Sequence, residues 1–205
     1  PPAPATPRRA QTGSRASVPA SRPFLLLAAA LTLSAFALYA VVMGLVPLLL
    51  ARGASPSTAA WALGLGGLGQ TLGRTLYTGL AARSGIRART ATLITAGGMT
   101  TALLAAVPGP VPLLIALSVL AGTVRGNLTL LQATAVTDRW GTARYGRLSA
   151  LLAAPVTIAG ALAPWAGTAL APPLGGYPHL FAALAAVSAA ATTLALAADR
   201  CTPDP

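Results

Sequence analysis

Two arginines, Arg74 and Arg125, stand within long apolar stretches of the sequence. A guanidinium stays protonated in proteins and offers five N–H donors but no acceptor. Placing such a charge at the centre of a bilayer costs about 2.5–3.5 kcal/mol on insertion scales, so it usually faces a protein interior or a water-filled cavity. We therefore expect these two side chains to attract an anionic group or to pair with carboxylates.

Polar residues accompany both arginines at helical spacing. Around Arg125, small and polar residues recur at steps of three and four, which places them on one face of a helix: Ser118, Gly122, Thr129 and Gln132. Gln70 precedes Arg74 by four residues and shares its face. We interpret both stripes as the lining of a polar pathway. Two simpler interpretations stay open, in which Arg74 extends to the membrane surface and Arg125 lies in a buried ion pair.

The other reactive side chains are few. The sequence has no Glu and no Lys, one histidine (His179), one cysteine (Cys201) and three aspartates (Asp138, Asp199 and Asp204). No His/Cys cluster has metal-ligand spacing, so we expect neither a metal nor a cofactor. His179 lies at the outer end of the last apolar stretch, and Asp138 and Asp199 lie at the ends of others. These positions disfavour a membrane-embedded enzyme, which needs a nucleophile beside a base or paired acids.

The composition indicates that lipid surrounds most of the chain. Of 205 residues, 55% are hydrophobic and only 8% are charged, whereas soluble domains carry about 25% charged residues. The formal net charge is +11, but the arginines lie in short segments between apolar stretches, without the interleaved aromatic residues of single-strand binding surfaces. We therefore exclude nucleic acid as a partner and expect the lipid bilayer.

The apolar stretches predict an all-α membrane protein with six transmembrane helices. A crossing needs about 20 apolar residues, and backbone groups in lipid must be bonded within their own segment, which favours helices. A disordered basic cytoplasmic segment over residues 1–23 and a cytoplasmic tail over residues 199–205 are expected to flank a transmembrane domain over residues 24–198. The expected spans are 24–50, 57–80, 90–107, 112–137, 148–170 and 177–198.

Arginines alternate between the two sides of the predicted membrane. With the N-terminus inside, the outside loops hold only Arg52 of the fourteen arginines. This asymmetry follows the positive-inside rule, so we expect a multi-pass protein of the plasma (inner) membrane with both termini in the cytoplasm. The inside arginines are Arg8, Arg9, Arg15, Arg22, Arg83, Arg87, Arg89, Arg139, Arg144, Arg147 and Arg200.

Glycines recur at four-residue spacing on the two stretches that hold the arginines. Gly69 and Gly73 lie on the second stretch, and Gly122 and Gly126 lie on the fourth. Such pairs let helix backbones approach closely in membranes. We therefore assign these four residues to helix packing.

Two loop sequences resemble the signatures of a known family. After the second span the chain reads Leu80-Ala81-Ala82-Arg83-Ser84-Gly85-Ile86-Arg87, which resembles the L-A-D-R-x-G-x-R cytoplasmic loop signature of the major facilitator superfamily. The acidic position of that signature is Ala82 here. After the fourth span, Asp138-Arg139-Trp140-Gly141 and Tyr145-Gly146-Arg147 look like the corresponding loop in the second half of the family.

The resemblance implies both a fold and a function. The chain would be the C-terminal half of a transporter, made of two three-helix inverted repeats and rocking around a midplane site against an N-terminal six-helix half. It would be a secondary active transporter of a small solute, either an efflux protein or an uptake permease, and not an enzyme. Its loop residues would serve in cytoplasmic gating: Arg83, Gly85, Arg87, Asp138, Arg139, Gly141, Gly146 and Arg147.

On this interpretation the polar stripes line the substrate pathway. Arg125 and Arg74 would attract an anionic group of the substrate or pair with acids of the missing N-terminal half. Because no span is expected to hold a carboxylate, coupling to protons would require residues of that other half. A non-transporting scaffold or assembly subunit stays open as an alternative. The pathway residues would be Arg125, Ser118, Thr129, Gln132, Gln70 and Arg74.

Overall fold

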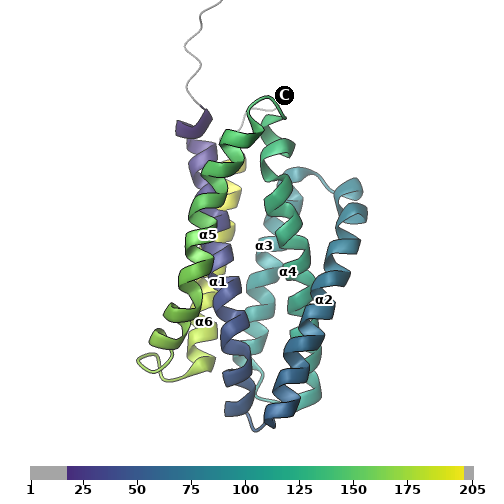
Figure 1. Ribbon diagram of the computed structural model, residues 1–205, viewed down its shortest axis with the longest axis vertical. Helices are drawn as coiled ribbons and strands as arrows, with labels where there is room; N and C mark the ends of the chain where they lie inside the picture. Colours follow the sequence, from purple (N-terminus) through teal and green to yellow (C-terminus); the bar gives the residue numbers. More distant parts are fainter. Residues whose placement is uncertain (1–17, 201–205) are drawn as a thin grey trace, which may run out of the picture.

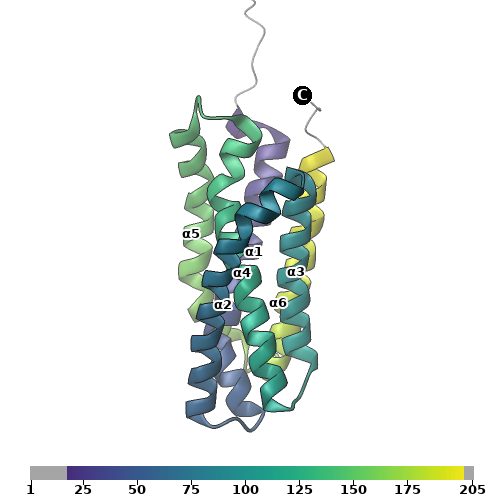
Figure 2. The same cartoon turned by 90° about the vertical axis from the view of Figure 1, so that its right-hand side faces the viewer.

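The computed structural model describes residues 18–200. Most of the predicted basic segment and most of the predicted tail, including Cys201, lie outside the described residues. Within them, a short 3-10 turn (Val18–Ala20) leads into helices that run up and down the long axis (Figures 1 and 2). The six helices are α1 (Arg22–Ala51), α2 (Pro56–Arg83), α3 (Ile86–Ala106), α4 (Val111–Trp140), α5 (Tyr145–Leu170) and α6 (Tyr177–Arg200).

Four helices of the described chain, α1, α4, α5 and α6, are long and apolar enough to cross a membrane. The other two, α2 and α3, have 28 and 21 residues, but glycine, threonine and arginine lower their average hydropathy. Even so, α2 turns an apolar face outward, because Trp61, Leu68, Leu72 and Leu76 are each more than half exposed. Helices with apolar outer faces are the arrangement that lipid requires.

Local sequence explains where α2 begins and α4 ends. The hydroxyl of Ser55 accepts a hydrogen bond from the backbone N–H of Thr58 at 3.1 Å, and Pro56 occupies the first helical position. α4 ends at Gly141, whose φ of +70° is a conformation that residues with a Cβ rarely adopt. The chain therefore reverses in a short loop before Tyr145.

At the end of the bundle that holds Val18 and Arg200, several helices extend past the predicted spans. α3 begins earlier than predicted, and α4 and α6 end later. Arg89, Asp138, Arg139 and Asp199, which the sequence suggested for loops or for the tail, therefore lie in helical turns. The physical reason is length: a helix longer than about 20 residues reaches beyond the hydrocarbon core, and its last turn can hold charges at the membrane surface.

The helices form two groups of three that are joined along α3 and α6. α1 packs along α5 and α6, α4 packs along α2 and α3, and α3 packs along α6. Figure 1 shows the two groups side by side. Apolar side chains fill the bundle in two clusters, one around Leu48, Leu104 and Phe181, and the other around Leu31 and Leu131. Each group of three thus combines helices from both halves of the sequence.

α2 and α4 make the closest helix contact in the described chain. A Cβ added to Gly69 or Gly73 would overlap the backbone of α4, and one added to Gly122 or Gly126 would overlap the backbone of α2. Only glycine permits backbones to lie this close. The contact therefore sets the middle of α2 beside the middle of α4, and it brings their polar stripes together.

Candidate functional site

A polar cavity lies between α1, α2 and α4. Its volume is about 160 Å³. Tyr39 comes from α1, Gln70 comes from α2, and Arg125, Thr129 and Gln132 come from α4. The apolar part of the lining is Ala35, Leu38 and Leu128.

The cavity lies at the middle of all three helices. α4 runs from 111 to 140, so Arg125 stands 14 residues after its start and 15 before its end. At 1.5 Å per residue these separations are roughly 21–22 Å. Gln70 and Tyr39 are also close to the centres of α2 and α1. In a bundle that crosses a bilayer, this is the depth at which a charge most needs a polar or wet surrounding.

Four of the five polar side chains in the lining make no hydrogen bond or ion pair with any other described residue: Tyr39, Gln70, Arg125 and Gln132. Thr129 differs, because its hydroxyl donates to the carbonyl oxygen of Gly126 at 2.7 Å. The same hydroxyl accepts from Nε of Arg74 at 3.4 Å. The cavity therefore presents one positive charge and several hydrogen-bonding groups that the described part of the chain leaves available.

The structure divides the predicted pathway residues. Arg125, Thr129, Gln132 and Gln70 line the cavity, and Arg74 lies at its edge. Ser118 does not line it: the residue is buried, and its hydroxyl donates to the carbonyl oxygen of Leu114 at 2.8 Å. The reason is distance along the helix, because Ser118 precedes Arg125 by seven residues, or roughly 10 Å. At that level α4 faces Gly66 of α2.

A second cavity of about 240 Å³ lies between α4 and α5. Its polar lining residues are Gln132 of α4 with Tyr145 and Ser149 of α5. The remaining lining is apolar and consists of Ala133, Val136, Leu152, Ala153 and Val156. Gln132 lines this cavity as well as the mid-helix one, so the two cavities lie on either side of its side chain.

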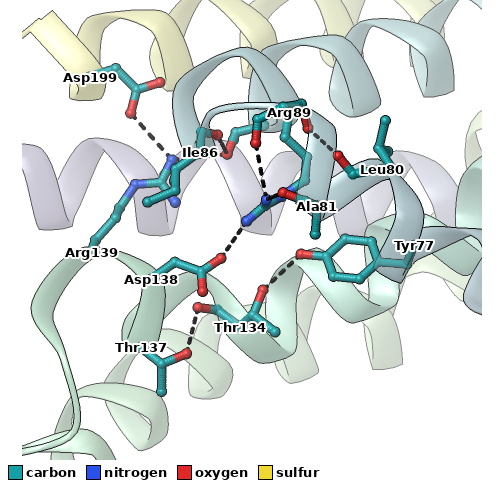
Figure 3. Close-up of polar contacts among 12 residues, drawn as sticks. Tyr77, Leu80, Ala81, Ile86, Arg89, Thr134, Thr137, Asp138, Arg139 and Asp199 are labelled. Carbon is teal, nitrogen blue, oxygen red and sulfur yellow. Dashed lines mark hydrogen bonds and ion pairs between the residues drawn. The ribbon is translucent and has the colours of Figure 1, made fainter.

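Two ion pairs join helix ends at the end of the bundle that holds Val18 and Arg200 (Figure 3). We call the residues of these pairs and the polar side chains beside them the helix-end cluster: Arg89, Asp138, Arg139, Asp199, Thr90, Tyr77 and Thr134. Arg89 of α3 lies 2.5 Å from the carboxylate of Asp138 of α4. Arg139 of α4 lies 3.2 Å from Asp199 of α6 and donates to the hydroxyl of Thr90 at 2.9 Å. The side chains of Arg89 and Arg139 are only 6% and 8% exposed, so these pairs are interior contacts that tie α3, α4 and α6 together.

Tyr77 extends the helix-end cluster to α2. The guanidinium of Arg89 lies 5.5 Å from the centroid of the Tyr77 ring, which is within cation–π range. The hydroxyls of Tyr77 and Thr134 share a hydrogen bond of 2.8 Å, and Figure 3 shows both beside the ion pair. Arg89 also donates to the carbonyl oxygens of Ala81 and Ser84 at 3.4 and 3.5 Å. The guanidinium of Arg89, carried by α3, thus contacts the ends of both α2 and α4.

Residues of the two family-like loops are divided between the helix-end cluster and the surface. Asp138 and Arg139 belong to the cluster, in the last turn of α4 rather than in a loop. The others are exposed at the same end of the bundle: Arg83, Gly85, Arg87, Gly141, Gly146 and Arg147. Within residues 18–200, no three His, Cys, Asp or Glu side chains gather as a metal site would require.

Arg89 and Asp199 are site residues that the sequence prediction missed. Acidic residues near a helix C-terminus oppose the helix macrodipole, so Asp138 and Asp199 each required a nearby cation. That signal is present in the sequence. The choice of partner is not, because 49 and 60 residues separate the paired side chains along the chain.

Comparison of the sequence with models of known protein families gives a match over most of the chain. The family model described as Major Facilitator Superfamily matches residues 25–205 of the sequence. The matched range contains both cavities and the helix-end cluster. A search of curated proteins finds no match to the chain.

Proposed function

The chain belongs to the major facilitator superfamily, a family of membrane transporters, and from this premise we propose that it forms the C-terminal six-helix half of a secondary active transporter. Membership makes it a multi-pass membrane protein of a transporter family rather than of an enzyme family. Its solute is small and carries an anionic group. The solute binds at the mid-helix cavity while the transporter alternates its access between the two sides of the membrane.

The observation that supports this proposal most is that the guanidinium of Arg125 has no bonded partner among the described residues. Its guanidinium lines a cavity at mid-helix and has no hydrogen-bond or ion-pair partner among residues 18–200. Arg89 and Arg139, by contrast, are held by carboxylates. An arginine kept for structure alone would be bonded in the same way, since an unpaired charge at that depth is costly. Arg125 is therefore suited to bind an anion that reaches the cavity.

The helix pairing supports an inverted repeat of α1–α3 and α4–α6. Exchanging α1 with α4, α2 with α5 and α3 with α6 converts the α1–α5 contact into the α4–α2 contact. The same exchange converts α1–α6 into α4–α3 and leaves α3–α6 unchanged. Such internal symmetry is how transporter folds place a site at the repeat interface near the midplane.

The outward polar groups of α1 and α2 favour a second six-helix half as the partner. Tyr39 is 43% exposed, and Arg74 is also exposed, although both lie well inside their helices. A polar face at that depth is incompatible with lipid tails. The N-terminal half covers it, so that the mid-helix cavity lies between the two halves.

The helix-end cluster holds this half together as one body while it rocks. Separating a buried ion pair leaves an uncompensated charge, which is strongly unfavourable, so α3, α4 and α6 move as a unit. The arginine distribution assigns this end to the cytoplasm. The exposed arginines Arg83, Arg87 and Arg147 then face the cytoplasmic gate between the halves.

The substitution Arg125→Gln tests the proposal, with Arg144→Gln as its matched control. Arg144 is exposed in the loop before α5 and belongs to neither cavity nor the helix-end cluster. Solutes whose cellular content changes on expression are identified by mass spectrometry, and their flux is then measured in proteoliposomes. We expect Arg125→Gln to abolish the flux with unchanged membrane insertion and Arg144→Gln to retain it.

Two results would count against this function. Full flux in Arg125→Gln would remove the arginine from the mechanism. A wild-type protein that moves no solute but co-purifies with an acidic membrane protein would instead identify an assembly subunit.

A further inference from the structure

We propose that the solute is an amphipathic monoanion that occupies both cavities, with its charge on Arg125 and its apolar arm between α4 and α5. This inference rests on the proposed function and specifies its substrate class. It follows from what lines each cavity and from the residue that the two cavities share.

The charge of the solute follows from the mid-helix cavity. Arg125 is the one charged residue in its lining, and no acidic residue lines it. Arg74 lies at the edge with its Nε directed to the hydroxyl of Thr129. One guanidinium and no carboxylate match a single negative charge, and they disfavour a solute that also carries an ammonium group.

The polar groups around Arg125 suit a carboxylate. An ionised carboxylate only accepts hydrogen bonds, at about four lone-pair positions, and an arginine can donate two of them in parallel. Gln70 and Gln132 add amide N–H donors, and Tyr39 adds a hydroxyl. None of these side chains makes a hydrogen bond or an ion pair with another described residue.

The apolar arm follows from the second cavity. Five of its eight lining residues are apolar, and apart from Gln132 its polar groups, Tyr145 and Ser149, come from the first turns of α5. Pockets for small organic ligands usually measure about 300–1,000 Å³. At about 160 and 240 Å³, each cavity alone is below that range, so a solute of ordinary ligand size needs both.

Gln132 is the positioning residue of this two-part site, because it lines both cavities. Its amide can donate to the anionic group, while its aliphatic carbons border the apolar arm. A third cavity of about 300 Å³, between α3 and α6, gives a contrast: its lining holds no charged residue. Ala189 of that cavity and Ala153 of the α4–α5 cavity therefore form a matched pair for filling experiments.

The test measures binding by calorimetry to the full transporter in zwitterionic nanodiscs. The probes are 4-phenylbutyrate, its neutral amide 4-phenylbutanamide, and butyrate, which keeps the charge without the aryl group. We expect 4-phenylbutyrate to bind at least 10-fold more tightly than the other two. Arg125→Gln should abolish the preference for the acid over the amide. Gln132→Ala should weaken the binding of 4-phenylbutyrate at least 5-fold.

Filling the apolar cavity separates the two parts of the site. Ala153→Leu should weaken the binding of 4-phenylbutyrate at least 10-fold and leave the binding of butyrate unchanged. Ala189→Leu should leave the binding of both compounds unchanged. Equal binding of acid and amide, or no effect of Ala153→Leu, would overturn the substrate class. Tight binding of added oleate with no binding of 4-phenylbutyrate would overturn the small-solute part of the proposal, because the bound anion would then be a membrane lipid.

A separate measurement keeps failure of this inference distinct from failure of the proposed function. Thr129→Cys, in a background without other cysteines, is labelled with a membrane-impermeant maleimide from each side of the membrane. Labelling from both sides supports alternating access whichever solute binds. Labelling from one side under every condition would contradict the transporter mechanism itself.

Discussion

Arg89 and Asp138 form an ion pair of 2.5 Å between α3 and α4, although 49 residues separate them in the chain. The next residue, Arg139, pairs with Asp199 on α6. Two adjacent residues of opposite charge at the end of α4 thus bind two different helices. Arg89 and Asp199 therefore neutralise both charges that this turn of α4 brings into the bundle.

Asp138→Asn should destabilise the bundle by roughly 2 kcal/mol. Removing one partner of a buried pair costs about 3–5 kcal/mol, but the side chain of Asp138 is 25% exposed, and solvent screens part of this loss. The measurement is thermal unfolding in detergent, followed by size-exclusion fluorescence. The double variant Arg89→Gln/Asp138→Asn should lose less free energy of unfolding than the two single variants lose together. Strict additivity would show that the two side chains do not interact.

Gly73→Ala should destabilise the α2–α4 contact by about 1–3 kcal/mol, which is typical of overpacking. The added methyl group would meet the backbone carbonyl of Thr123 on α4, and a backbone cannot rotate away as a side chain can. Gly67→Ala is the matched control on the same helix, because a Cβ at Gly67 meets nothing within 4 Å. The control should be neutral or slightly stabilising, since alanine favours helix more than glycine does. Equal unfolding temperatures for the two variants would be the contrary result.

Tyr77→Phe and Tyr77→Leu should separate two contributions of one side chain. The Phe variant removes the hydrogen bond to Thr134 and should cost about 0.5–1.5 kcal/mol. The Leu variant also removes the ring beside Arg89 and should cost about 0.5–2 kcal/mol more. Thermal unfolding in one detergent and one buffer compares the two. Identical losses would show that the ring does not stabilise the guanidinium.

The general course of the helices was predictable because a long apolar run has few stable alternatives in lipid. The Ser55 cap of α2 and the positive φ of Gly141 show how local sequence is sufficient to begin and end such helices. The ends were less predictable. Charged residues mark the membrane surface, but Arg89 and Asp199 are accommodated in helical turns because other helices neutralise them.

The candidate site was predictable in part. Arg125, Thr129 and Gln132 share a helix face, and periodicity alone identifies such a face. Periodicity could not exclude Ser118, because a stripe continues along a helix whether or not a cavity does. It could not include Tyr39 either, since an isolated tyrosine in an apolar helix shows no pattern.

Sequence by itself determined that the chain folds as helices and that Arg74 and Arg125 fall within apolar stretches, because both properties depend on residues close together in the chain. Only the tertiary structure decided which arginines are neutralised. Arg89 and Arg139 meet aspartates of other helices, and Arg125 meets none among the described residues. The physical reason is that such pairs depend on how helices pack, which local spacing does not contain.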